Sequence, residues 1–204
     1  MNVKLALALT AALAASPLLP AADIALPAAD IALPAPDRKG GMPLMQTLNQ
    51  RKSSRAYAEK QLPSQTVSDL LWAASGVNRP DGRMTAPTAR NIQEITLYAI
   101  LPSGAYRYDA KANRLAQVSS ENLTQSVTGK APLTVVYVAD TKKQPNLKMS
   151  AVDCGFIGQN IYLYCASAGL STVIRGSFDK GFISKLNLPE ESEVFFIQSV
   201  GFPK

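Results

Sequence analysis

The chain has 204 residues, of which 47% are hydrophobic and 18% charged, with no histidine and two cysteines. Without histidine there is no imidazole to activate a serine or cysteine nucleophile or to bind zinc or iron. The composition therefore argues against such hydrolases and metalloenzymes, and no metal site is expected. The net charge of +6 favours an anionic partner, but the basic residues are scattered apart from residues 51–55, so no nucleic-acid partner is expected.

Residues 1–14 have the pattern of a secretory signal peptide, with Lys4 ahead of a short apolar run and small residues at its end. The run is too short for a convincing membrane span, which needs ~20 residues. We therefore expect an exported, periplasmic protein with no stable membrane span after cleavage. A retained N-terminal anchor is the alternative.

An alanine- and proline-rich segment follows at residues 15–42. The heptamer PAADIAL occurs twice in it, at residues 20–26 and 27–33. A proline in every heptad excludes a coiled coil, because each proline would break the helix interior. The segment is expected to be an extended, flexible linker.

Residues 43–204 form the expected domain, in which helix and strand patterns alternate. Helices are expected at residues 43–50, 62–75, 120–130, 150–168 and 179–186. Strands are expected at residues 94–101, 105–109, 114–118, 132–139, 171–175 and 193–200. The fold class is α+β, with a mixed, mainly antiparallel sheet flanked by helices, and the apolar run at residues 132–139 predicts a central strand buried on both faces.

The helix at residues 150–168 is apolar on every side, which predicts an internal helix. Ser150 and Asp153 have the spacing of a capping box, so the helix is expected to begin at Ser150. Cys154 and Cys165 are eleven residues apart on this helix, too far for a disulfide, and are expected to be small buried hydrophobic residues.

Four motifs in this domain occur in one register: RKSSRAY at residues 51–57, PTARNIQEITLYAI at 87–100, VDCGFIGQNIYLYCASAGLSTVIRGSF at 152–178 and VGFP at 200–203. Together they resemble the nitroreductase family of FMN-dependent oxidoreductases. The resemblance implies an intertwined homodimer with the long helix in its core and one FMN at each of two subunit interfaces. A second subunit would then cover the helix where Gly155 and Gly158 stand.

The resemblance also implies which residues hold the FMN. Arg51 and Lys52 correspond to cations at the FMN phosphate, and Ser53 to a hydroxyl on the phosphate or the ribityl chain. Arg55 corresponds to the basic residue at the pyrimidine edge of the flavin ring, where a guanidinium stabilises the charge of the reduced ring. Relatives often carry further basic residues beyond the last strand, whereas this chain offers only Lys204 for the phosphate.

A second group of residues corresponds to the loop that covers the flavin from the partner subunit: Pro87, Thr88, Ala89 and Asn91, with Gln93 in support. Arg175 and Gly176 correspond to the turn beside the flavin N5 and O4 atoms, where a glycine permits close approach. Many relatives have an acidic residue at the position of Arg175, so the preferred substrate does not follow from the resemblance.

The activity implied is ping-pong hydride transfer through flavin N5 to a small acceptor, such as a nitro-compound or a quinone. It requires no catalytic side chain of the protein's own, in agreement with the missing histidine. NAD(P)H is one expected electron donor, but export would separate the protein from cytosolic NAD(P)H, so the donor stays open. The alternatives are a non-catalytic flavin- or ligand-binding protein on the same fold and an FMN dehydrogenase of the kind that oxidises azolines.

Overall fold

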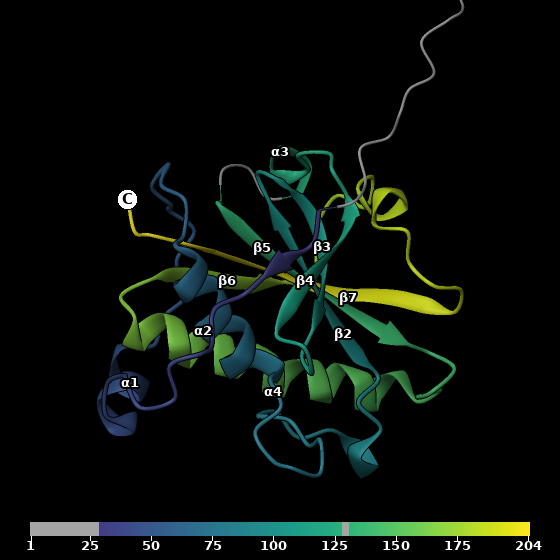
Figure 1. The fold of residues 1–204 in the computed structure, drawn as a ribbon, viewed down its shortest axis with the longest axis horizontal. Coiled ribbons are helices and arrows are strands. Elements are labelled where there is room, and N and C mark those ends of the chain that lie inside the picture. The colour runs from purple at the N-terminus through teal and green to yellow at the C-terminus, as the bar shows by residue number, and fades with distance from the viewer. Residues whose placement is uncertain (1–28, 128–130) are drawn as a thin grey trace, which may run out of the picture.

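A seven-stranded sheet runs through the centre of the molecule in a computed structural model that describes residues 29–127 and 131–204 (Figure 1). The strand order is β1-β4-β3-β2-β5-β7-β6, and each pairing between the described strands is antiparallel. The strands are β1 (Ile31–Ala32), β2 (Ile95–Leu101), β3 (Gly104–Asp109), β4 (Arg114–Ser119), β5 (Leu133–Asp140), β6 (Ser171–Arg175) and β7 (Ser192–Gly201). The predicted α+β class and mainly antiparallel sheet are confirmed.

Four α-helices accompany this sheet in the described part of the chain: α1 (Leu44–Gln50), α2 (Ser64–Ser75), α3 (Thr124–Val127) and α4 (Leu147–Ser167). Two short 3-10 helices, η1 (Ala89–Asn91) and η2 (Ile183–Leu186), lie in the connections. Of the helix predicted at residues 120–130, the described residues contain the single turn α3. Residues 128–130 lie outside the described residues.

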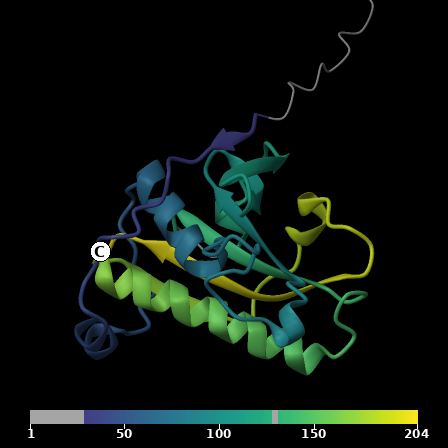
Figure 2. The ribbon, with the colours of Figure 1, turned by 60° about the horizontal axis from the view of Figure 1, so that its bottom comes forward.

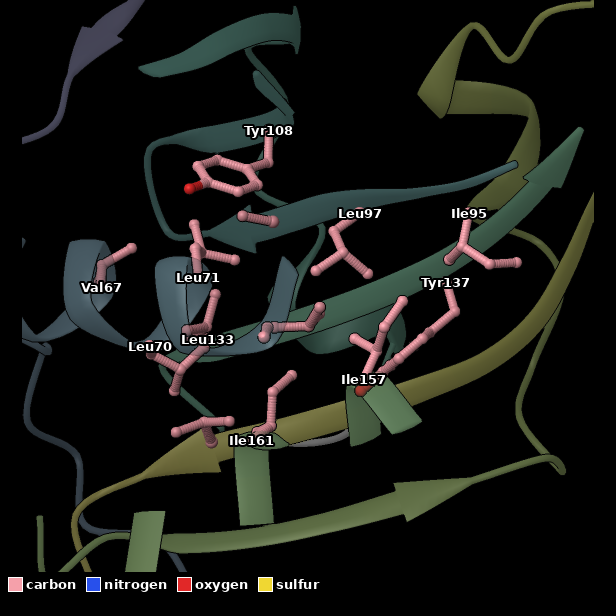
Figure 3. Close-up of a cluster of buried hydrophobic side chains, with 14 of the residues drawn as sticks. Val67, Leu70, Leu71, Ile95, Leu97, Tyr108, Leu133, Tyr137, Ile157 and Ile161 are labelled. Carbon is pink, nitrogen blue, oxygen red and sulfur yellow. The ribbon is translucent and has the colours of Figure 1, made fainter. Parts of the chain in front are cut away.

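The sheet is buried on both faces, as the apolar run of β5 predicts. Alternate residues of a strand point to opposite faces. Leu133, Val135 and Tyr137 accordingly belong to the cluster under α2 and α4, whereas Val136 and Val138 pack on the other face with Phe182 and Leu186. Figure 3 shows labelled side chains of α2, α4 and the sheet pointing into one space: Val67, Leu70, Leu71, Ile157, Ile161, Leu97, Leu133 and Tyr137.

α4 lies along the sheet with its C-terminal end beside α1 and the chain's C-terminus (Figures 1 and 2). Its predicted end is confirmed, because Gly169 has a left-handed φ of 66° and the Leu170 amide donates to the Cys165 carbonyl at 2.8 Å. Its predicted start is wrong. Asn146 is the N-cap and its side chain accepts from the Lys148 amide, so the helix begins at Leu147, ahead of Ser150.

The two glycines of α4 lie on different faces. A Cβ at Gly158 would meet the Ile174 side chain of the same protomer at 3.0 Å, so tight packing on β6 favours glycine here. A Cβ at Gly155 would meet no heavy atom within 4 Å among the described residues. The expectation that a second subunit explains both glycines is therefore wrong for Gly158, whose close neighbour is its own sheet.

The expectation of a flexible linker at residues 15–42 is wrong for residues 29–37. β1 pairs with β4, and the Pro34 carbonyl accepts from the side chains of Ser68 and Asn113. The physical reason is that Ile31 and Leu33 pack against the core, which the proline pattern does not reveal. The predicted signal peptide and the first PAADIAL copy lie outside the described residues.

None of the helices in residues 29–127 and 131–204 combines the length and the apolar character that a bilayer span requires.

Candidate functional site

The basic segment at residues 51–55 leaves α1 and lies against the start of β6. Arg51 caps α1, and its amide donates to the Thr47 carbonyl at 2.9 Å. The Ser54 amide donates to the Thr172 carbonyl at 2.9 Å, and the Ser171 hydroxyl donates to the Ser54 hydroxyl at 3.1 Å. Backbone and side chain together hold this segment beside the sheet edge.

Tyr162, near the C-terminal end of α4, connects this segment to β6. Its ring lies 5.3 Å below the Arg51 guanidinium carbon, and its hydroxyl is 2.9 Å from the Ser53 Oγ. The same hydroxyl accepts from the Ile174 amide at 3.1 Å. The sequence analysis did not single out Tyr162. A tyrosine on a helix that is largely apolar could have indicated it. The hydroxyl of a buried tyrosine usually has a hydrogen-bond partner, so such a residue often connects its helix to another element.

The buried side chain of Tyr57 lies within the electrostatic influence of Arg55 and Arg175. Burial raises the pKa of the Tyr57 phenol, and Ser199 and the charges of Arg175 and Arg55 only partly oppose that rise. Tyr57 is thus a neutral phenol at neutral pH. A bridge from Tyr57 to Pro203 and a bond of 2.9 Å from the Ala58 amide to the Phe202 carbonyl bring the chain's C-terminus to the same place.

Arg175 at the end of β6 is only partly partnered. One of its terminal nitrogens donates to the Ser199 hydroxyl at 3.2 Å, but its buried Nε has no hydrogen-bond partner among the described residues. A buried donor without an acceptor is costly, so this atom fits a bound group that supplies one. Gly176 follows, exposed on one side, while an added Cβ would lie 3.3 Å from the Phe196 ring.

A pocket of about 420 Å³ opens beside these groups, and Lys52, Tyr162, Gly169, Ser171 and Pro203 are among its lining residues. Lys204 follows Pro203 directly. Within the described residues, no ion pair is formed by any of the five cations around this part of the surface: Arg51, Lys52, Arg55, Arg175 and Lys204. Cations gathered without acidic partners make a surface suited to a phosphate-bearing ligand.

The second predicted group, the loop at residues 87–93, lies elsewhere on α4. The Ala89 amide donates to the Asp153 carboxylate at 2.9 Å, and the Gln93 amide donates to the Thr88 hydroxyl at 3.0 Å. The Gln93 side-chain amide donates to the side-chain Oδ1 of Asn91 at 3.1 Å, while Pro87 is exposed. These contacts tie the loop to the N-terminal half of α4.

This loop has a strained backbone. Arg90, Asn91 and Gln93 have left-handed φ angles of 56°, 57° and 53°, a conformation that costs non-glycine residues about 1 kcal/mol or more each. Such strain persists only where surrounding contacts hold it. The Asp153 hydrogen bond and the Gln93 contacts provide that support.

Under the loop lies a buried carboxyl pair that the sequence analysis did not predict. Glu94 is 1% exposed, and neither of its carboxyl oxygens has a hydrogen-bond partner of good geometry among the described residues. Burial raises the pKa of Glu94, and the neighbouring Asp153 raises it further. Ser150 and Asp153 were expected to cap the helix. They lie instead within the length of α4, and their side chains are neighbours of Glu94.

One protomer does not bring the two predicted groups together. Asp153 and Tyr162 are nine residues apart on α4, hence about 14 Å along its axis at ~1.5 Å per residue. Figure 1 shows the segment after α1 at one end of the helix and the loop before β2 below its other half. Within one protomer the two groups therefore contact separate parts of α4.

The outer face of α4 carries apolar side chains that the described residues leave partly exposed. Val152 is 50% exposed and Phe156 42%, and on α1 Met45 is 75% exposed. The two cysteines of α4 point inward. Burial raises the pKa of both Cys154 and Cys165 to about 12, so they are inert thiols, as expected.

Comparisons with known proteins place the chain in one protein family. The model of the nitroreductase family matches residues 48–202. A candidate nitroreductase of Methanocaldococcus jannaschii is 25% identical over 156 residues, which cover 66% of this chain and 79% of that protein.

Two solved structures extend the comparison. The crystal structure of a candidate nitroreductase from Ralstonia eutropha JMP134 is 39% identical, with a TM-score of 0.81, and the match covers 86% of this chain and 90% of that one. An FMN-dependent nitroreductase from Clostridium difficile R20291 is 19% identical, with a TM-score of 0.55, and the match covers 78% and 87% of the two chains. At this lower identity the likeness concerns the fold.

Proposed function

Because the chain belongs to the nitroreductase family, we propose that it is an FMN-dependent oxidoreductase that reduces small acceptors such as nitro-compounds or quinones. FMN would supply hydride transfer at its N5 atom, and donor and acceptor would use the same open site in turn. The observation that carries the proposal is the basic surface beside Tyr162 and Tyr57. Within the described residues its cations form no ion pair, and the buried Arg175 Nε has no hydrogen-bond partner.

In this proposal the chain's own residues bind and orient the cofactor. Arg51, Lys52 and Lys204 hold the phosphate, with Ser53 fixed by Tyr162 as a hydroxyl partner. Arg55 faces the pyrimidine edge of the ring. Since the chain has no histidine and its cysteines are buried, the described residues offer no obvious nucleophile, which agrees with chemistry carried by a cofactor.

We further propose that the active form is a homodimer. The exposed apolar face of α4 would pack against the same face of a second copy, because fully burying a side chain such as Phe156 contributes about 1.5–3 kcal/mol. The partner's loop at residues 87–93 would then cover the flavin held by Arg51 and Arg55. The separation of the two groups along α4 supports this arrangement.

We propose that the protein is exported to the periplasm, from the signal-peptide pattern of residues 1–14. NAD(P)H is the first donor to test, and a donor available outside the inner membrane is the alternative that export favours.

The test is the visible absorption spectrum of the purified protein, reconstituted with FMN if necessary, before and after NADPH is added without oxygen. Yellow protein that NADPH bleaches supports the proposal with NAD(P)H as donor. Yellow protein that dithionite reduces but NADPH does not supports flavin binding. It leaves two readings, another electron donor or a non-catalytic binding role, and an assay with quinone and nitro acceptors distinguishes them. Colourless protein that does not take up FMN overturns the proposal.

A further inference from the structure

The edge of β4 has a groove that binds a segment of the chain's own N-terminal arm. Ile31 and Ala32 pair with Leu115 and Arg114 of β4. The Asp30 carboxylate accepts from the Arg114 guanidinium at 2.6 Å and from the Gln117 amide at 3.0 Å. An aspartate at the head of a short strand therefore sets its register on β4.

The groove also selects the residues that follow this aspartate. Ile31 and Leu33 line a hollow of about 180 Å³ together with residues of α2 and the sheet, such as Val67 and Leu115. Further along, the Pro34 carbonyl accepts from Asn113 at 2.8 Å, and the Ala35 carbonyl accepts from Gln65 at 2.9 Å. The bound pattern is thus aspartate, two apolar residues flanking an alanine, and a proline.

The sequence contains this pattern twice. Residues 20–30 read PAADIALPAAD and residues 27–37 read PAADIALPAPD, and the two differ only where Ala29 corresponds to Pro36. Each side chain that the groove binds has an earlier counterpart, Asp23 for Asp30, Ile24 for Ile31 and Leu26 for Leu33. The chain thus carries two copies of the occupant for this one described groove.

We propose that the groove on β4 accepts either copy within the same chain, so that the arm occupies two registers seven residues apart. In the shifted register Asp23 binds Arg114, and residues 31–37 join the connection to α1. The segment ahead of the groove becomes shorter by up to about 23 Å of extended chain at ~3.3 Å per residue. This shift would adjust how far the domain reaches from whatever holds its N-terminus.

Two features make the register with residues 27–37 the dominant one. It places Arg38 over the Trp72 ring at 5.2 Å, a contact that the shifted register loses. It also leaves a shorter connection to α1, although lengthening a loop costs little. Binding within the chain is favoured over binding between chains, because the short connection keeps the first copy at a high effective concentration near the groove.

Cysteine pairs test the two registers directly in the full-length chain. Ala32 and Arg114 are register partners, so Ala32→Cys/Arg114→Cys should form a disulfide and report the observed register. Ala25→Cys/Arg114→Cys reports the shifted register, with the same loss of Arg114. Ala28→Cys/Arg114→Cys is the control for random encounters, because residue 28 is closer to the groove in sequence but lies out of register in both states.

We expect a disulfide within one chain for the Ala25 pair, slower than for the Ala32 pair and faster than for the Ala28 pair. Adding Ile31→Asp/Leu33→Asp should increase it several-fold, because the second copy can then no longer compete. An Ala25 pair that reacts no faster than the Ala28 pair would overturn the proposal. Disulfides that link two chains only would overturn it as well.

Thermal stability supplies a second readout that does not depend on arginine 114. Ile31→Asp/Leu33→Asp should lower the unfolding temperature only slightly, since the first copy replaces the second. Adding Ile24→Asp/Leu26→Asp to that variant should lower it much further, whereas Ile24→Asp/Leu26→Asp alone should change little. Equal losses with and without the first copy would contradict the shift. The inference does not depend on the proposed function.

Discussion

The hydroxyl of Tyr162 lies 2.9 Å from the Ser53 Oγ, and through this contact α4 orients the basic segment that follows α1. The same hydroxyl accepts from the Ile174 amide of β6. One side chain therefore links the three elements from which the proposed phosphate and ring contacts come. Removing its oxygen is the smallest change that disturbs the site without removing a charge.

Tyr162→Phe should weaken FMN binding by roughly 5- to 30-fold, because the hydrogen bonds that orient Ser53 and Ile174 contribute about 1 kcal/mol each. Titration of the protein with FMN, followed by flavin fluorescence, measures the effect. The matched control is Tyr106→Phe, which loses a comparable bond to the Ser103 carbonyl in a turn beyond β2. Equal FMN affinities in the two variants would show that Tyr162 does not organise the site.

Arg51→Ala/Arg55→Ala should reduce FMN affinity by about 100-fold or more, since charge-assisted hydrogen bonds contribute about 1.5–3 kcal/mol each. Circular dichroism should show an intact fold, because neither side chain forms an ion pair within the described residues. Arg83→Ala/Arg107→Ala removes the same charge from exposed positions elsewhere and should leave flavin content unchanged. Unchanged flavin occupancy in the first variant would refute the placement of the phosphate and pyrimidine contacts.

Glu94→Gln should alter the pH dependence of stability. Because the pKa of Glu94 is raised above 4.5 in the folded chain, the native state binds more protons than the unfolded state at pH values above that point. Wild-type stability should therefore fall as pH rises from about 4.5 through the raised pKa, and the glutamine variant should lack this fall.

Urea unfolding at several values between about pH 4 and pH 8 measures this difference. Glu59→Gln, at an exposed position, serves as the control and should follow the wild type. Asp153→Asn should reduce the slope, because the Asp153 charge contributes to the raised pKa of Glu94. A slope that is the same in wild type and Glu94→Gln would mean that Glu94 is ionised in the native protein.

Gly158→Leu should destabilise each protomer by about 1–3 kcal/mol, because its side chain would overpack against Ile174. At Gly155 an added Cβ meets no heavy atom within 4 Å among the described residues. Gly155→Leu should therefore unfold at or above the wild-type urea concentration under monomeric conditions, because leucine favours a helix over glycine by about 0.8 kcal/mol. The reverse order of stabilities would place Gly158, rather than Gly155, on the open face of α4.

Val152→Glu/Phe156→Glu should convert the proposed dimer into monomers, because burying unpaired carboxylates at an interface costs several kcal/mol. Flavin content should fall with it, since the covering loop would come from the second copy. Sedimentation velocity reports the mass. Gln125→Glu/Ser126→Glu changes the charge equally at exposed positions of α3 and should remain dimeric. Monomers that bind flavin as tightly as the wild type would show that the flavin site does not need the second copy.

The sequence predicted those features that depend on residues close together along the chain. The end of α4 was predicted because Gly169 and Leu170 complete a hydrogen-bonded pattern with residues of the last turn. The start was mispredicted because Ser150 and Asp153 have capping-box spacing, whereas Asp153 bonds the distant Ala89 amide and Asn146 caps the helix. Nothing near residue 150 in the sequence indicates the loop that competes for its carboxylate.

The same distinction applies to the candidate site. Motif order placed Arg51, Lys52, Ser53 and Arg55 in one segment. In the structure Ser54 ties this segment to β6, and Lys52 lines the pocket there. Tyr162, Glu94 and Tyr57 were missed, because their importance comes from partners on other elements. The repeat at residues 20–37 was recognised as a pattern, but its binding to β4 depends on Arg114 at the sheet edge.

By itself the sequence determined the element types, the central position of β5, the α+β class and the identity of the basic segment, because these follow from periodicity, turn residues and neighbouring side chains. Only the tertiary structure decided that Ser53 meets Tyr162, that Glu94 lies buried beside Asp153 and that Asp30 binds Arg114. Each of these pairs joins residues far apart along the chain, and the strand order and the packing of α4 bring them together.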